Sequence, residues 1–316
     1  MYQVLKSKFQ FSSLITMVIN NDGLTPVDQT KLVITKPKST AAGIPAVISS
    51  TIHSLKKMGP LKTIKTLKMV NQKAGFDCPG CAWPDPEHRS SFEFCENGAK
   101  AVADEAMKSN VNKAFFAKYT VKELAEKSDF WLNSQGRIAE PMYLKKGGTN
   151  YQPISWENAF SIISSKLNSL KSPNNAVFYT SGRTSNEAAF LYQAFVRMYG
   201  TNNLPDCSNM CHESSGKALV STIGIGKGTV TLEDFNHADT ILVIGQNPGT
   251  NHPRMLTALR DAKKHGAQII HINPLPETGL VRFKHPQDYM KLKFNSTKLA
   301  DFHIPIKIGG DAALFQ

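Results

Sequence analysis

The chain has 316 residues, of which 41% are hydrophobic and 20% charged, and its formal net charge at pH 7 is +12. This length exceeds what one hydrophobic core usually organises, so we expect two structural units, and no apolar run is long enough for a membrane span. Nine lysines and no acidic residue lie between Thr30 and Gly75, but almost no aromatic residue is interleaved with them, which argues against nucleic acid as a partner.

The N-terminal stretch carries lysines and a short apolar run, but neither a small-residue cleavage site nor a twin arginine. We therefore expect a weakly ordered basic segment over residues 1–43 and a cytoplasmic location. The five cysteines fit thiols kept for metal in a reducing compartment better than a disulfide framework. From Ile44 to Val70, apolar residues at helical spacing, broken at Gly59-Pro60, predict two short amphipathic helices with lysine-rich outer faces.

A cysteine group follows, with Cys78 and Cys81 in a CxxC pair and Cys95 further on. CxxC brings two thiolates onto one turn, which suits zinc or an iron-sulfur cluster because both need several converging soft ligands. Asp85 or His88 could supply a further oxygen or nitrogen ligand, so a structural zinc site stays open. A redox dithiol is less favoured, because no strand precedes Cys78 and Cys95 would have no part in it.

Regular structure is predicted from Thr120 onward. T-V-K-E is a capping box that opens a helix to about Asn133, and residues 141–144 and 151–154 flank K-K-G-G-T-N as the strands of a hairpin. S-W-E-N then opens a helix with a stripe that we expect to be core. The stripe comprises Trp156, Ala159, Phe160, Ile163, Leu167 and Leu170.

Strands and helices alternate after this point. The predicted strands are residues 176–179, 240–244 and 268–272, and the predicted helices end at Tyr199 and near Lys264. This order indicates a parallel sheet, in which ligands bind at the carboxyl ends of the strands, against helix N-termini. The segments S-G-R-T-S-N-E and G-Q-N-P-G-T-N-H-P lie at such ends.

Between these strands, Cys207, Cys211 and His212 lie close together before an expected helix. Cys211 would be at the helix N-terminus, where unpaired N–H groups favour a metal-binding thiolate, and His212 could hold or relay a proton. The alternative is that both cysteines are small buried apolar residues.

These motifs, in this order, resemble the catalytic subunits of molybdopterin oxidoreductases, in the formate-dehydrogenase-like branch often called YdeP-like. The resemblance runs from about Gly75 to the last residue. It implies a [4Fe-4S] cluster on Cys78, Cys81 and Cys95, with Lys100 between cluster and pterin. It further implies that Cys211 binds molybdenum beside His212, in a molybdenum bis(molybdopterin guanine dinucleotide) cofactor. The matching cofactor-binding residues are Gly182, Arg183, Asn186, Gly245, Asn247, Pro248, His252 and Pro253.

The sequence also departs from the family pattern. Asp85 stands where the family usually has its third cluster cysteine, so the cluster is expected to be Asp-ligated, reduced in size or lost. The common D-P-R is here Asn273-Pro274-Leu275, and Glu213-Ser214 replaces Gly-Pro. Catalytic subunits of the family are longer, so we expect this chain to stop within the large domain and to be inactive by itself.

We therefore predict an α/β protein, with a small iron-sulfur-type domain over residues 44–154 and a Rossmann-like molybdopterin-binding domain over 155–316. The resemblance implies two-electron oxidation of formate or a similar small substrate, with an electron-acceptor protein as partner. Two alternatives stay open, an inactive fragment and a zinc-knuckle protein with a plain Rossmann-like binding domain.

Overall fold

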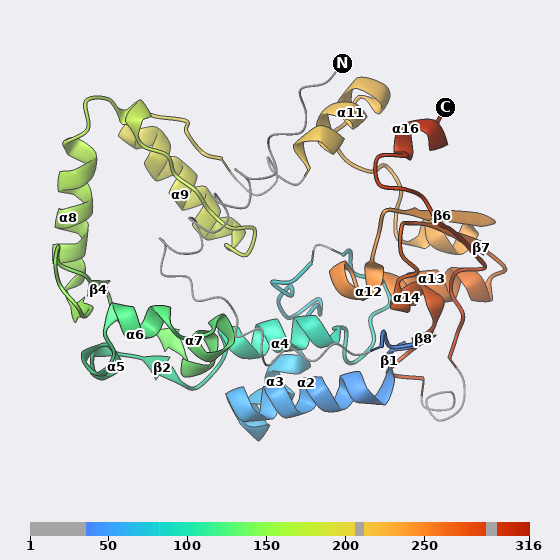
Figure 1. The fold of residues 1–316 in the computed structure, drawn as a ribbon, viewed down its shortest axis with the longest axis horizontal. Coiled ribbons are helices and arrows are strands. Elements are labelled where there is room, and N and C mark those ends of the chain that lie inside the picture. The colour runs from blue at the N-terminus through green and yellow to red at the C-terminus, as the bar shows by residue number, and fades with distance from the viewer. Residues whose placement is uncertain (1–35, 82, 206–211, 289–295) are drawn as a thin grey trace, which may run out of the picture. The chain divides into compact units, whose positions relative to one another are not determined.

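The computed structural model describes residues 36–81, 83–205, 212–288 and 296–316 (Figure 1). These residues belong to two compact units, one containing residues 104–166 and the other formed by Pro37–Ala103 with Leu167–Gln316. Helices and a parallel sheet are both present, as the α/β prediction requires. The domain boundaries expected after residues 43 and 154 stay a prediction. Within the described ranges, no helix combines the length and the apolar character that a membrane crossing needs.

The core of the larger unit is a three-stranded parallel sheet in the order β6-β7-β9. Its strands are β6 Thr240–Ile244, β7 Gln268–Ile272 and β9 Phe302–Ile304, so the predicted strands 240–244 and 268–272 are confirmed. Helix α13 (Met255–Lys264) buries Leu256 and Leu259 in a cluster with Val243 and Ile269. The spacing of apolar residues in the sequence therefore predicted the core between α13 and the sheet correctly.

Short elements follow the carboxyl ends of the strands. Gly245 has φ +65°, which suits glycine, and leads into α12 (Pro248–Asn251), while α14 (Thr278–Val281) follows β7. The two short helices meet at glycines, since a Cβ added to Gly279 would lie 3.0 Å from the Cα of Gly249. Any side chain at either position would push apart the turns that end β6 and β7.

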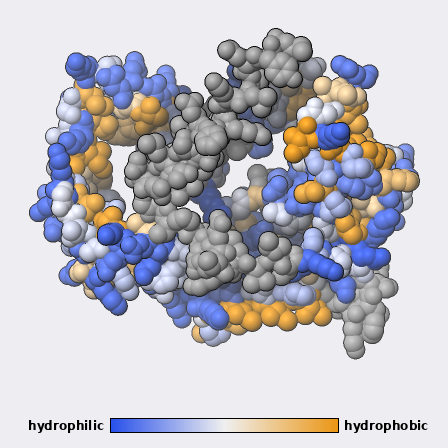
Figure 2. All heavy atoms as spheres, viewed as in Figure 1, coloured by the Kyte–Doolittle hydropathy of each residue, from blue (hydrophilic) through white to orange (hydrophobic). Residues whose placement is uncertain are grey.

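Two helices begin the larger unit, α2 (Gly43–Met58) and α3 (Pro60–Leu67), and both predicted helices are confirmed. The break falls at Gly59, whose φ is +76°. The inner face of α2 is made of small residues and Met58, whereas its isoleucines are about half exposed. The apolar stripe of α2 therefore lies on the outside together with lysines, and Figure 2 shows apolar atoms at the surface over this helix.

The remaining elements of the larger unit are short or peripheral. Strand β1 (Ala41–Ala42) pairs in parallel with β8 (Phe283–Lys284), and α4 (Glu96–Glu105) begins directly after Cys95. Apart from α9, which is described below, the other described elements are the 3₁₀ turns η2 (Pro173–Asn175) and η3 (Glu233–His237), and helices α11 (Glu213–Ile223) and α16 (Asp311–Leu314).

The smaller unit contains short elements around a hairpin. The predicted hairpin is confirmed by the antiparallel pair β4 (Met142–Tyr143) and β5 (Gln152–Pro153). The capping box at Thr120 is confirmed, but the single helix expected to run to Asn133 is wrong. It is divided into α6 (Val121–Ala125) and α7 (Asp129–Gln135), because the Ser128 side chain caps a new helix by accepting from Trp131 N at 3.2 Å. Strands β2 (Asn110–Val111) and β3 (Arg137–Ile138) pair in parallel, and α5 (Lys113–Lys118) follows β2.

Two further predictions need correction. Helix α8 (Trp156–Asn168) forms, but its stripe is not core among the described residues, since Trp156 and Phe160 are 60% and 61% exposed. The expected strand at 176–179 is an extended segment, with Ala176 and Phe178 buried and Phe178 N donating to Asn203 O at 2.9 Å. The local spacing of apolar residues predicts that a helix or strand forms, but it does not predict which other element covers its apolar face.

Helix α9 (Asn186–Tyr199) follows this segment and has the predicted ends. The Ser185 side chain caps its first turn by accepting from Ala188 N at 3.3 Å, and Gly200 ends it in the left-handed region. Val196 on its inner face packs with Phe178, so the turn before α9 is anchored in this unit.

Candidate functional site

The three cysteines expected to hold a cluster share one cavity of about 300 Å³ in the larger unit. Its wall also includes residues of the turn between α12 and α13 and the arginine of S-G-R. The lining residues are Asn71, Cys78, Gly80, Cys81, Cys95, Asn97, Gly98, Arg183, Thr250, Asn251, Pro253 and Arg254. Expected cluster ligands and two expected cofactor-binding residues, Arg183 and Pro253, therefore face the same space.

Hydrogen bonds shape the cysteine loop. The Asn71 side chain accepts from Cys78 N at 2.7 Å and donates to Glu93 O at 2.6 Å, so one amide joins both ends of the loop. Gly80 N lies 3.4 Å from the Cys78 sulfur and Gly98 N lies 3.2 Å from the Cys95 sulfur, each as a donor. Backbone N–H groups directed at sulfur stabilise the thiolate form that binds metal.

The space beside these sulfurs depends on glycine. A Cβ added to Gly98 would lie 2.8 Å from the Cys78 sulfur and 3.6 Å from that of Cys95. Burial raises the pKa of the Cys78 and Cys95 thiols, so binding of a metal by these residues would release protons.

The three cysteines line one cavity, but among the described residues they form no site for a single metal ion. Within the described residues, no three His, Cys, Asp or Glu side chains converge on one position that could hold a metal ion. A cluster spreads its thiolates over several iron atoms, so its cysteines need not meet at one point. The cavity, its three thiols and the glycine at Gly98 are therefore compatible with an iron-sulfur cluster.

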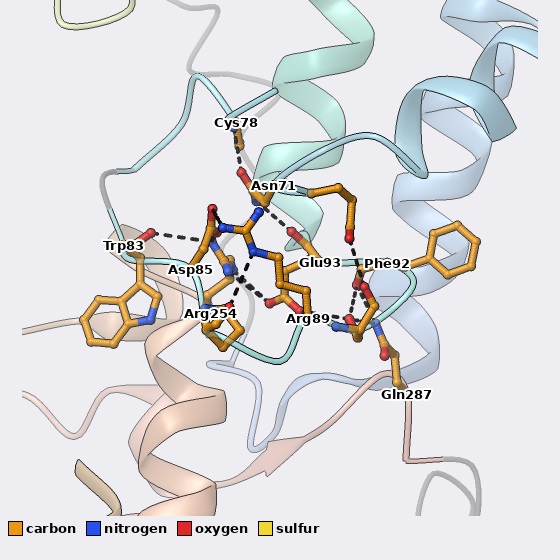
Figure 3. A network of polar contacts seen from close by, with 12 residues as sticks. Asn71, Cys78, Trp83, Asp85, Arg89, Phe92, Glu93, Arg254 and Gln287 are labelled. Atoms are coloured by element: carbon orange, nitrogen blue, oxygen red, sulfur yellow. Dashed lines mark hydrogen bonds and ion pairs between the residues drawn. The ribbon is translucent and has the colours of Figure 1, made fainter. Parts of the chain in front are cut away.

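A buried ion-pair network lies next to the cysteines (Figure 3). Arg254, whose side chain is 11% exposed, lies between two acidic residues, with Nη1 2.7 Å from Asp85 Oδ1 and Nη2 3.0 Å from Glu93 Oε1. Its Nη1 also donates to Trp83 O at 3.5 Å, and Arg89 Nη2 lies 3.4 Å from Asp85 Oδ2. The network ties the cysteine loop to the turn that starts α13.

Lys100 lies on α4, and its Nζ donates to Glu96 Oε1 at 2.7 Å. It is not among the residues that line the cysteine cavity. Its expected place between cluster and pterin stays a prediction.

The turns at the carboxyl ends of β6 and β7 are joined by a carboxylate. Glu277 Oε2 accepts from Asn247 Nδ2 at 2.8 Å, and its Oε1 lies 3.3 Å from Asn273 Nδ2 as acceptor. Pro248 is buried at the start of α12, and the His252 ring contacts that of Trp83 from the cysteine loop at 6.2 Å between centroids. Asn247, Pro248 and His252 are thus held at the predicted end of the sheet.

The other expected residues are placed as follows. Gly182 and Asn186 belong to the turn and first residue of α9, and Gly245 opens the turn after β6. His212 is an exposed residue at the N-cap of α11, where its carbonyl accepts from Gly216 N at 2.8 Å. Cys207 and Cys211 lie outside the described residues.

Sequence reasoning missed Arg254, Asn71 and Glu277. Arg254 directly follows His252-Pro253 and precedes Met255, which was expected to face inward. A charged residue next to a buried helix face usually has a partner of opposite charge, and this could have indicated its role. Nothing local marked the other two, because their partners are distant in sequence.

The family model for molybdopterin oxidoreductase matches residues 137–316, more than half of the chain. An uncharacterized oxidoreductase of Mycobacterium tuberculosis is 55% identical over 297 residues, which are 94% of this chain and 38% of that protein. Protein YdeP of Escherichia coli is 50% identical over 278 residues, which are 87% of this chain and 37% of that protein. Formate dehydrogenase H of Escherichia coli is 28% identical over 185 residues, which are 57% of this chain and 24% of that protein.

The chain therefore belongs to the molybdopterin oxidoreductase family. Membership implies a molybdopterin cofactor and redox chemistry, in agreement with the resemblance found in the sequence. The chain spans less than two fifths of the length of these curated relatives.

Proposed function

We propose that this protein is a molybdenum oxidoreductase that carries a bis(molybdopterin guanine dinucleotide) cofactor and oxidises formate or a similar small anion. Electrons leave through an iron-sulfur cluster on Cys78, Cys81 and Cys95 to an acceptor protein. The observation that carries the proposal is the shared cavity, whose wall contains these cysteines together with Arg183 and Pro253 from the expected cofactor-binding turns. Electron transfer between two redox centres requires that they lie close together. The cavity wall contains residues expected to bind the cluster and residues expected to bind the molybdenum cofactor.

The cofactor-binding part of the proposal rests on the parallel sheet. Diphosphate groups bind at the carboxyl ends of parallel strands, where unpaired N–H groups and positive charge are available. Asn247 and Pro248 follow β6 at such an end, and Arg183 precedes α9. Arg183 also places positive charge on the cavity wall, which suits an anionic cofactor and an anionic substrate, whereas Arg254 is already paired with Asp85 and Glu93.

The chemistry divides between the cofactor and the chain. When bound, the molybdenum cofactor supplies a metal that takes up the two electrons released when formate becomes carbon dioxide. We assign Cys211 as the thiolate ligand of that metal and His212 as the acceptor of the proton released from formate. We assign Lys100 as the positive charge beside the electron path from the cofactor to the cysteines.

The test is to produce the chain in a host that makes the cofactor and to purify it without oxygen. We expect bound iron, molybdenum and guanine nucleotide. Binding is measured before turnover, because the expectation that the chain alone is inactive stays a prediction. Zinc bound at the cysteines, with neither iron nor molybdenum, would reject the proposal in favour of a zinc-binding protein.

The substrate is tested separately by dye reduction in a homologous chain of full family length that contains molybdenum, because the 316 residues alone are expected to be inactive. Formate-dependent reduction that is lost in Cys211→Ser supports the assignment. If dye reduction depends on another small acid and not on formate, the protein is still an oxidoreductase but formate is not its substrate.

A further inference from the structure

The resemblance in the sequence puts Asp85 where a cluster cysteine is expected, but its carboxylate is paired with arginines. Oδ1 lies 2.7 Å from Arg254 Nη1, and Oδ2 lies 3.4 Å from Arg89 Nη2. The side chains of Asp85 and Arg254 are 16% and 11% exposed, so water screens this pair little. Both oxygens of the carboxylate therefore lie at ion-pair distance from guanidinium groups, although the buried Oδ1 accepts no hydrogen bond from the described residues.

The described part of the cavity wall supplies no substitute for the missing cysteine. Among the described residues that line it, only the three cysteines are ionisable metal ligands, since no Asp, Glu or His is present. The Asn71 amide already uses its oxygen on Cys78 N and its nitrogen on Glu93 O. Asp85 itself does not line the cavity.

Arg254 has a second carboxylate partner, Glu93, which fixes the orientation of its guanidinium group. Glu93 Oε1 lies 3.0 Å from Arg254 Nη2 and 3.3 Å from its Nε, in a side-on pair. The other oxygen of Glu93 accepts from the backbone N and hydroxyl of Ser90, at 3.1 and 2.9 Å. The guanidinium is thus held from both sides, and Asp85 cannot turn toward the sulfurs without leaving Arg254 half paired.

We propose that a cluster bound here is held by three thiolates only, from Cys78, Cys81 and Cys95, and that Asp85 is a positioning residue. Through Arg254, Asp85 fixes the cysteine loop against the turn that starts α13. This inference rests on the proposed iron-sulfur cluster and names its ligand set. The cluster then has either three irons, or four irons of which one has no ligand from the chain and is open to a small external ligand.

The test compares substitutions on the two sides of the ion pair. Asp85→Asn removes the negative charge while keeping the shape, and Arg254→Gln removes its partner while leaving Asp85 intact. Cys95→Ser removes a proposed ligand. Each protein is reconstituted with iron and sulfide without oxygen, and the iron-to-sulfide ratio, the electron paramagnetic resonance spectrum and the rate of iron loss to a chelator are measured. Far-ultraviolet circular dichroism confirms that each variant is folded.

We expect Asp85→Asn and Arg254→Gln to keep the iron-to-sulfide ratio and the spectrum of the unsubstituted chain. Both should lose iron about tenfold faster, because residues that orient metal ligands typically affect metal binding by that order. The double variant should lose iron no faster than either single one, since both act on the same contact. Cys95→Ser should lose most of its iron.

A three-iron spectrum supports the inference, and so does a four-iron spectrum that shifts on addition of a small external thiol. A four-iron cluster that no external ligand perturbs would show a fourth ligand from the chain. A change of cluster type in Asp85→Asn but not in Arg254→Gln would identify Asp85 as that ligand. Either result overturns the inference while leaving the proposed function intact. Zinc in place of iron in the unsubstituted chain overturns both.

Discussion

The cysteine loop, residues 71–95, and the sheet β6-β7-β9 belong to the same unit but are held by different forces. The sheet with α13 is stabilised by a contiguous apolar cluster that includes Leu259 and Ile269, both fully buried. The described part of the loop contains no helix or strand, and polar contacts of Asn71 and Arg254 hold it in addition to the packing of Cys78 and Phe94 on a small apolar cluster. Burial of apolar surface is non-directional, whereas hydrogen bonds weaken steeply away from their preferred distance and angle.

This difference explains which parts of the two regions the sequence predicts. Leu256 and Leu259 recur at helical spacing, and two of the three strands are apolar runs bounded by turn residues. The spacing of apolar residues along the sequence was therefore enough to predict α13, β6 and β7. Glu93 and Arg254 are separated by 161 residues, and no local pattern relates them. The cysteines were found as a motif, but the contacts that orient them were not predictable because they depend on the tertiary fold.

The same limit explains the errors. The stripe of α8 and the isoleucines of α2 have helical period, and both helices form, but the period does not say which face meets another element. The division of the helix expected after Thr120 depends on one serine hydroxyl, Ser128, that competes with helix continuation.

The largest effect should come from the sheet core. Leu259→Ala removes a fully buried side chain from the cluster that covers β6 and β7, and we expect it to lower the free energy of unfolding by about 3 kcal/mol. Urea denaturation followed by circular dichroism measures this. Ile308→Ala is the matched control, because Ile308 is 93% exposed and its truncation should cost about 0.5 kcal/mol or less. Equal losses in the two variants would contradict the assigned core.

Substitution of Arg254 should destabilise the cysteine loop much more than the sheet. Arg254→Met keeps an apolar stem but leaves Asp85 and Glu93 without their shared partner, and we expect a loss of about 2 kcal/mol that is confined mainly to the cysteine loop. Native-state hydrogen exchange should show faster exchange at Cys78 N and Ala99 N, with β6 and β7 unchanged. Uniform loss of protection in both regions would show that the network supports the whole unit.

A smaller effect is expected at the carboxyl ends of the strands. Glu277→Gln removes the charge that accepts from Asn247 and Asn273, and we expect a loss of about 1 kcal/mol. The variant should also bind the molybdenum cofactor less well, since Asn247 would be free to turn away from its expected ligand. Unchanged cofactor content together with unchanged stability would show that Glu277 does not position this turn.

The effect that is smallest near neutral pH is protonation of His285, since it develops only below about pH 6.5. Burial, followed by the nearby Arg260, lowers the pKa of His285 from 6.5 to about 4, with Lys264 acting in the same direction and Asp261 and Asp288 opposing. Between pH 6.5 and 4 the unfolded chain therefore binds more protons at this histidine than the folded one, and stability falls as the pH is lowered through this window. His285→Gln should flatten the dependence of the melting temperature on pH in this range, whereas His237→Gln, at an exposed position, should leave it unchanged. An unchanged slope in His285→Gln would exclude this group as its source.

We propose that the cysteine loop and the turns at the carboxyl ends of the strands bind parts of one redox cofactor assembly. The most direct test counts iron, zinc and molybdenum in protein purified without oxygen from a host that makes the cofactor, for the unsubstituted chain and for Cys95→Ser. We expect iron and molybdenum without zinc in the unsubstituted chain, and loss of iron in Cys95→Ser. Zinc without iron or molybdenum in the unsubstituted chain, or iron that does not depend on Cys95, would contradict it.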